Sequence, residues 1–224
     1  DASVSARYRR LNEPAGHECW SLTVKGCQGG HSGMDIILCR ANANRQIARI
    51  LDRIIDKHDV KLIDLEGGTL RNAIPREAFA TVYVPAGKTA AVLKTVSAIA
   101  AEIKSEYAAT DPGLQVIFEP YKCEEGACCD PDECRYVQPQ AAKRFIKAIL
   151  ACPDGVERMS DAMPGMVETS NNLAMVKIYK GEFSVNCLMR SSVDSAKEAL
   201  AQRMKAVFEL AGCKIRFSGG YSGW

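Results

Sequence analysis

Residues 18–25, Glu-Cys-Trp-Ser-Leu-Thr-Val-Lys, alternate in character and place Trp20, Leu22 and Val24 on one face. This alternation predicts a half-buried strand. A glycine-rich turn follows, and the apolar residues after it recur at helical spacing, at positions 47, 50, 51, 54 and 55. That spacing predicts a helix over about 38–57.

The elements that follow complete a known supersecondary order. Residues 61–66 and 77–84 are predicted as strands, and the second of them is rich in β-forming side chains. Apolar positions between Val92 and Tyr107 predict a second helix, and residues 114–118 alternate as a further strand. The resulting order, β-α-β-β-α-β, is the ferredoxin-like order.

The C-terminal part repeats this pattern incompletely. Pro139 opens a predicted helix, residues 152–165 are predicted as a loop, and a hairpin, a helix and a strand follow (173–179 with 183–189, a helix with the capping-box spacing Ser195-Ala-Lys-Glu198, and 214–218). We therefore predict an α+β protein of two tandem ferredoxin-like units, 1–120 and 121–224, with an antiparallel sheet and helices packed on one face. A cysteine-rich loop, 120–136, opens the second unit.

Composition narrows the class of protein. The 224 residues carry a formal net charge of +2, are 47% apolar and 25% charged, and contain no apolar run near the ~20 residues of a membrane span. These values exclude a disordered or collagen-like chain and argue against nucleic-acid and membrane partners.

Ten cysteines stand out, four of them clustered at positions 123, 128, 129 and 134. This spacing differs from the paired Cys-x2-Cys pattern of zinc knuckles, so a reduced loop and a structural metal both stay open. The periodic helices are unlike a secreted disulfide scaffold, and we expect a reducing, cytoplasmic compartment.

Three residues could carry chemistry. His31, between glycines, could donate to a carbonyl or an oxyanion, or could be a surface turn residue. Asn72, in a polar segment between two strands, could bind a carboxylate or an amide, or could belong to an ordinary loop. Arg190, at a strand end, suits bidentate carboxylate binding or a surface position. No His-x-Asp, His-Glu-x-x-His or Gly-x-Ser-x-Gly motif is present, so we assign no metal ligand.

Several motifs together resemble one family. They are Lys-Gly-Cys-Gln-Gly-Gly-His-Ser-Gly (25–33), Gly-Gly-Thr-Leu-Arg-Asn-Ala-Ile-Pro-Arg-Glu-Ala (67–78), Val-Glu-Thr-Ser-Asn (167–171), Cys-Leu-Met-Arg-Ser-Ser (187–192) and Gly-Tyr-Ser-Gly-Trp (220–224). In this order and spacing, over about 17–224, the sequence resembles the aminoacylhistidine dipeptidases (Xaa-His dipeptidase, peptidase D, carnosinase-like), a branch of the co-catalytic di-zinc metallopeptidases.

The resemblance implies a lid domain inserted into a zinc-binding catalytic domain, with a histidine, an asparagine and an arginine that close over the substrate. It implies that His31 polarises the scissile carbonyl or stabilises the oxyanion, and that Asn72 and Arg190 hold the substrate's C-terminal carboxylate. The family's metal ligands are not recognisable here. We therefore expect the two zinc ions to be bound outside this chain, and the chain alone to be inactive.

The sequence thus predicts the lid and dimerisation region of a cytosolic Xaa-His dipeptidase. Its expected partners are a dipeptide substrate, its own catalytic domain and, because sheet edges invite pairing, a second copy in a homodimer. Two alternatives stay open: a non-catalytic ligand-binding or oligomerisation module with ferredoxin-like repeats, and a metal or redox protein built on the cysteine cluster.

Overall fold

The computed structural model describes residues 1–121 and 134–220. Its strands are β1 (Ala2–Arg7), β2 (Arg10–Leu11), β3 (His17–Lys25), β4 (Gly30–His31), β5 (Lys61–Gly67), β6 (Ala73–Ile74), β7 (Ala78–Pro85), β8 (Gln115–Pro120), β9 (Tyr136–Val137), β10 (Gly155–Met159), β11 (Val167–Tyr179), β12 (Glu182–Ser191) and β13 (Lys214–Phe217). Its helices are α1 (Ala43–His58), α2 (Thr89–Glu106), α3 (Pro139–Ala151) and α4 (Asp194–Leu210), with short 3-10 helices at Ile36–Leu38 and Ala86–Lys88.

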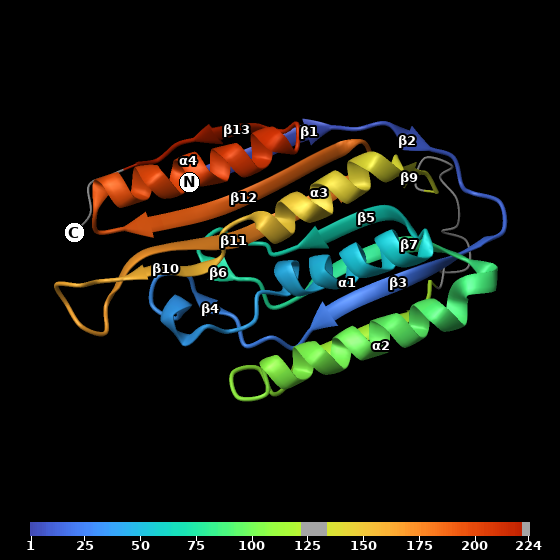
Figure 1. Ribbon diagram of the computed structural model, residues 1–224, viewed down its shortest axis with the longest axis horizontal. Helices are drawn as coiled ribbons and strands as arrows, with labels where there is room; N and C mark the ends of the chain where they lie inside the picture. Colours follow the sequence, from blue (N-terminus) through green and yellow to red (C-terminus); the bar gives the residue numbers. More distant parts are fainter. Residues whose placement is uncertain (122–133, 221–224) are drawn as a thin grey trace.

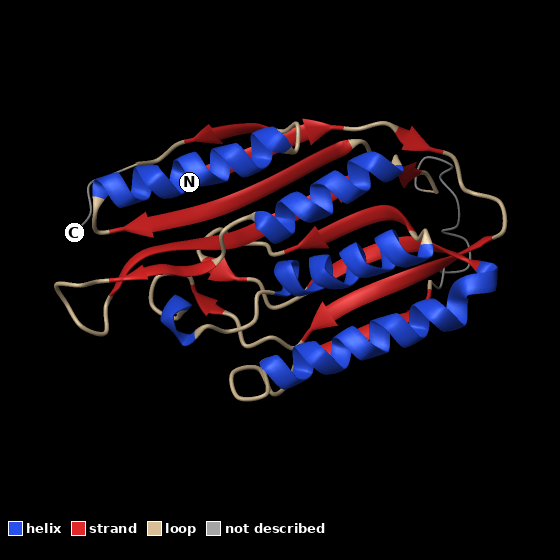
Figure 2. Ribbon diagram, viewed as in Figure 1, coloured by secondary structure: helices blue, strands red, loops and turns tan. Residues whose placement is uncertain are grey.

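One large sheet organises these elements. Its strand order is β13-β1-β12-β11-β5-β7-β3-β8, with β10 added beside β11, and neighbouring strands run antiparallel. The four α-helices lie over one face of this sheet (Figures 1 and 2). The predicted α+β class with a large antiparallel sheet is confirmed.

A continuous core lies between the sheet and the helices. Buried side chains from β3, α1, α3 and β12 belong to a single cluster, for example Leu22, Ile50, Phe145 and Val185. Phe145 of α3 stacks on Phe183 of β12 with the ring centroids 4.3 Å apart. Because the amphipathic helices bury their apolar stripes against this sheet, the periodic segments of the sequence form the predicted elements.

Two predicted helix starts are wrong. The helix predicted from residue 38 begins at Ala43, because the side chain of Asn42 accepts a hydrogen bond from the N–H of Asn44 and caps the helix there. The capping box predicted at Ser195 does not form. Helix α4 already begins at Asp194, after Val193, so Ser195 lies inside its first turn.

Two of the longer strands, β10 and β1, lie where the sequence pattern does not predict them, and the two-residue strands β2, β4, β6 and β9 are not predicted either. Strand β10 occupies part of the predicted loop 152–165; its pairing with β11 is irregular and most of its residues are exposed, which hides any alternation. Strand β1 pairs with β12 on one side and β13 on the other. The first strand of the chain therefore lies among the last strands.

The sheet consists of two groups of strands: β13, β1, β12 and β11 on one side, and β5, β7, β3 and β8 on the other. The groups meet where β5 pairs with β11, through only three residue pairs, from Val176↔Gly67 to Ile178↔Leu65. A bulge in β11 lies beside this seam, between Leu173 and Met175. The side-chain amides of Asn42 and Asn44 donate to the Leu173 carbonyl oxygen over 3.1 and 3.2 Å. Buried amides thus satisfy backbone groups that a bulge removes from the regular ladder.

Gly68 is required at this seam. Its φ is +73°, and a Cβ there would overlap the carbonyl oxygen of Ala174 in β11. We expect Gly68→Ala to lower the free energy of unfolding by about 2 kcal/mol or more, because the left-handed conformation and the clash both cost energy. Urea unfolding checks this. Gly87→Ala is the control, since nothing lies within 4 Å of its Cβ; equal losses in both variants would contradict the expectation.

Asp154 supplies a second, pH-dependent test of the seam. One of its carboxylate oxygens accepts hydrogen bonds from the Asn42 amide and the Leu173 N–H, both over 3.0 Å. Burial raises the pKa of the Asp154 carboxyl. In the unfolded chain the Asp154 carboxyl loses its proton near its ordinary pKa of about 4, whereas in the folded state it keeps the proton to higher pH. The free energy of unfolding therefore falls as pH rises from the ordinary pKa through the raised pKa.

We expect Asp154→Asn, which keeps an acceptor oxygen but does not titrate, to gain stability relative to the unmodified chain as pH rises from 4 to 8. Urea unfolding at several pH values in this range measures the difference. If the difference in free energy of unfolding between Asp154→Asn and the unmodified chain stayed constant or shrank with rising pH, the raised pKa of Asp154 would be contradicted.

Candidate functional site

A cavity of about 770 Å³ lies at the end of the sheet where β12 continues beyond its pairing with β1. Its wall combines the ends of β11 and β12, the first turns of α4, the turn after β4, and residues 217–220. In Figure 1 this region lies at the tip of the β12 arrow, beside the start of α4. His31 and Arg190 both line it, although they are far apart in sequence.

The hydrogen bonds of His31 select one tautomer of its neutral ring. Its Nδ1 accepts hydrogen bonds from the backbone N–H groups of Gly33 and Met34, over 3.2 and 3.3 Å. An Nδ1 that accepts cannot carry a proton, so the neutral ring has its hydrogen on Nε2. His31 therefore presents an N–H donor from its Nε2 side.

The segment 28–41, which carries His31, is held at its two ends by one buried carboxylate, that of Asp111. Asp111, only 2% exposed, accepts from the N–H of Gln28 over 2.7 Å and from the N–H of Ala41 over 2.8 Å. Within the segment, the N–H of His31 donates to Asp35, and Arg40 donates to the carbonyl oxygen of Gly29. Because these bonds form within the chain, the histidine is positioned before any ligand binds.

Arg190 reaches the same place from β12, where it pairs with Ser170 of β11. A Cβ added to Gly33 would lie 3.1 Å from His31 Cε1 and 3.2 Å from Arg190 Cζ, so both side chains flank this glycine. The Nε of Arg190 is buried and has no hydrogen-bond partner among the described residues. A buried guanidinium donor without a partner is unusual, and a carboxylate is its natural complement.

Asn72 lies close to His31 through the backbone only. Its carbonyl oxygen accepts from the N–H of Ser32 over 2.9 Å, just beyond the pair His31↔Ala73 of β4 and β6. The Asn72 side chain is exposed and does not belong to the cavity wall. The structure thus brings His31 and Arg190 to one cavity, with Asn72 beside it.

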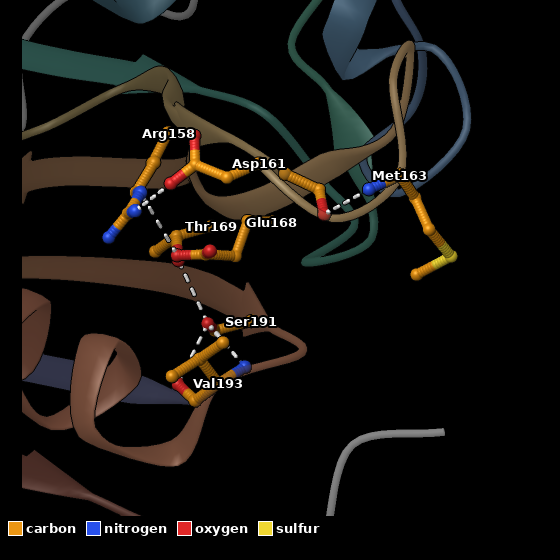
Figure 3. Close-up of polar contacts among 8 residues, drawn as sticks. Arg158, Asp161, Met163, Glu168, Thr169, Ser191 and Val193 are labelled. Atoms are coloured by element: carbon orange, nitrogen blue, oxygen red, sulfur yellow. Dashed lines mark hydrogen bonds and ion pairs between the residues drawn. The ribbon is translucent and has the colours of Figure 1, made fainter.

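Glu168 is a cavity residue to which the sequence motifs assign no role. It is 8% exposed, and its carboxylate lies 3.6 Å from the Nε of Arg158; the Nη2 of the same arginine pairs with Asp161 (Figure 3). Next to it, the hydroxyls of Thr169 and Ser191 join β11 to β12 over 2.8 Å (Figure 3). The sequence signal for this region is the polar run over 168–172, directly before the residues predicted as strand 173–179; the structure places this run in the first half of β11, with all five residues buried.

The cavity does not offer a metal site. In the two described ranges, 1–121 and 134–220, no three His, Cys, Asp or Glu side chains come close enough to hold a metal ion. His31 is the one imidazole in the wall, and the Glu168 carboxylate is engaged by Arg158. The residues here therefore do not fit the pair of zinc ions that the resemblance implies.

Parts of two predicted features lie outside the described residues. Of the cysteine cluster, Cys123, Cys128 and Cys129 are outside, whereas the carbonyl oxygen of Cys134 accepts a hydrogen bond from the Tyr83 hydroxyl over 2.9 Å. Of the C-terminal motif, residues 221–224 are outside.

Comparison with known proteins agrees with this architecture. Residues 22–111 match the family described as peptidase dimerisation domain. The chain is 37% identical to the cytosol non-specific dipeptidase of Escherichia coli (strain K12) over 94% of its own length and 42% of that protein. It superimposes on the crystal structure of aminoacylhistidine dipeptidase from Vibrio alginolyticus with a TM-score of 0.92 and 36% identity, covering all of this chain and 44% of that one.

The chain thus spans less than half the length of the two dipeptidases. In the part of the chain that the structure describes, none of the helices has the length and apolar character needed to cross a bilayer.

The fold, the family match and the sequence identity point to the same relatives. Residues 22–111 are thus similar to the peptidase dimerisation domain family, and nearly the whole chain is similar to one part of the two dipeptidases from E. coli and V. alginolyticus.

Proposed function

We propose that this chain is the substrate-covering lid and dimerisation region of a cytoplasmic metallodipeptidase that hydrolyses Xaa-His dipeptides. The observation that carries the proposal is the meeting of two donors at one cavity. His31 offers an Nε2–H, and the guanidinium of Arg190 lines the same cavity, with a buried Nε that has no partner among the described residues. A dipeptide supplies complementary groups, a carbonyl oxygen and a C-terminal carboxylate.

In this proposal each residue has a separate role. Arg190 holds the substrate's carboxylate, and Asn72 assists it from the adjacent segment. His31 donates to the scissile carbonyl oxygen as negative charge develops there. A donor fixed in advance costs no reorganisation during the reaction, and removal of one such donor typically lowers the rate by ~10²–10³.

The remaining chemistry belongs to a catalytic domain outside this chain. There, two divalent metal ions such as zinc would supply an activated water and polarise the carbonyl group. The described residues offer no ligand set for them, and we therefore expect no peptidase activity from this chain alone. The name of the E. coli relative supports a cytoplasmic location.

We interpret the large sheet as two ferredoxin-like units placed side by side. The strand order β8-β3-β7-β5 supports the first unit, and the order β13-β1-β12-β11 supports the second. The proposed division near residue 120 then applies to every long element except β1, which joins the second unit from the N-terminal end.

A homodimer is part of the proposal. Strands β8 and β13 are at the two ends of the sheet, and a free edge strand is a ready site for pairing. The family description of residues 22–111 favours this interpretation. The same description supports the alternative of a non-catalytic oligomerisation module, in which the cavity binds a ligand without chemistry. We propose no nucleic-acid or membrane partner.

The first experiment compares this chain with the longest gene product that contains it, in hydrolysis of an Xaa-His dipeptide with added Zn²⁺. Activity in the longer protein only is expected. There, His31→Ala should lower kcat by ~10²–10³ with an unchanged melting temperature. Activity of the chain alone would contradict a catalytic site outside it. Inactivity of both proteins would favour the oligomerisation module.

A second prediction concerns Arg190. In the longer protein, Arg190→Ala should raise KM about 10- to 100-fold for dipeptides with a free C-terminal carboxylate, because charge-assisted hydrogen bonds are lost. C-terminally amidated substrates should be affected little. Arg203→Ala is a matched control, since Arg203 is paired with Glu157 on the surface. Equal losses on free and amidated substrates would contradict the carboxylate role.

A further inference from the structure

We propose that Asn172 is a positioning residue, whose side-chain amide fixes the segment that carries Asn72 and, through it, the turn that carries His31. This inference rests on the proposed function for its kinetic consequence, although its structural content can be tested without it.

The contacts of Asn172 are specific. It lies on β11, is 1% exposed, and its Nδ2 donates to the carbonyl oxygen of Arg71 over 3.1 Å and to that of Ala73 over 2.8 Å. These two carbonyls flank Asn72. Both amide hydrogens are therefore used to hold the main chain on either side of one residue.

The same contacts continue to His31. The carbonyl oxygen of Asn72 accepts from the N–H of Ser32, and β4 pairs with β6 through Gly30↔Ile74 and His31↔Ala73. A shift of the 71–73 backbone would therefore move the His31 backbone with it.

Asn172 also connects this segment to Arg190. Asn172 pairs with Leu188 of β12, two residues from Arg190 on the same strand. The hairpin that bears Arg190 and the segment that bears Asn72 are thus joined by a side chain that belongs to the hairpin. The backbones of His31, Asn72 and Arg190, the three residues proposed to act on the substrate, are therefore each connected to the Asn172 amide through a short series of hydrogen bonds or strand pairs.

The chemistry of the position requires a donor. Two carbonyl oxygens accept but cannot donate, so an apolar side chain would leave both without this partner. The Oδ1 of Asn172 is buried and unpartnered among the residues that the structure describes. The amide is therefore present although half of its hydrogen-bonding capacity is unused, which points to the two donated bonds as its role.

The neighbouring Asn171 provides a matched control. It is equally buried, at 1% exposed, and its Nδ2 donates to the carbonyl oxygen of Pro153 over 2.6 Å. Successive side chains on a strand point to opposite faces, and so these two amides hold different segments. Truncation of either removes a buried amide, but only truncation of Asn172 releases residues 71–73.

The experiment measures amide hydrogen exchange by mass spectrometry in this chain and its Asn172→Ala and Asn171→Ala variants. In Asn172→Ala, peptides over 69–75 and 29–34 should exchange ~10-fold faster or more, with no such change in Asn171→Ala. Unchanged exchange in Asn172→Ala, or equal acceleration in both variants, would overturn the proposal. If Asn172→Ala does not fold, Asn172→Ser, which keeps one donor, takes its place under the same criteria.

In the longer protein, Asn172→Ala should lower kcat up to ~10²-fold, because displacement of a positioned donor weakens catalysis. Asn171→Ala should lose comparable thermal stability without this loss of kcat. The two proposals fail separately. Faster exchange in a protein without dipeptidase activity would overturn the proposed function alone, whereas an active enzyme with unaltered exchange would overturn the role of Asn172.

Discussion

The three-residue contact between β5 and β11 holds the two groups of strands in one sheet. It is short because β11 bulges beside it, and it is close because Gly68 carries no side chain there. The amides of Asn42, Asn44 and Asn172 supply hydrogen bonds that a longer ladder would have supplied. The cavity depends on this seam, since His31 comes from one side of it and Arg190 from the other.

The strongly periodic segments could be predicted from the sequence. Helices α1 to α4 and strands β3, β5, β7, β8, β12 and β13 lie close to the expected ranges, because each buries a regular apolar face. Strand β1 could not be predicted in the same way. Its inward side chains, Ala2, Val4 and Ala6, are small, and its partners lie nearly the whole chain away. The polar residues 168–172 were not predicted as part of a strand, because they are buried without being apolar.

The candidate site shows a different limit of sequence reasoning. From spacing alone, His31, Asn72 and Arg190 could each have been an ordinary surface or loop residue, and only the resemblance to a known family related them to one another. The structure places His31 and Arg190 at one cavity, but the side chain of Asn72 stays outside its wall. Residues that act through backbone contacts, such as Asp111 and Asn172, leave no motif, because their partners are carbonyl and N–H groups that every sequence contains.

The position of β1 has a consequence for biosynthesis. The N–H of Ser218 donates to the carbonyl oxygen of Asp1 over 3.0 Å, and so the two ends of this sequence lie side by side. During translation β1 is made before the other strands of this chain, whereas its partner strands β12 and β13 are made last. Its two edges stay unpaired for that whole interval, and closure of so long a loop slows folding. The alternating serines of β1, Ser3 and Ser5, keep one face of this strand polar until its partner strands have been synthesised.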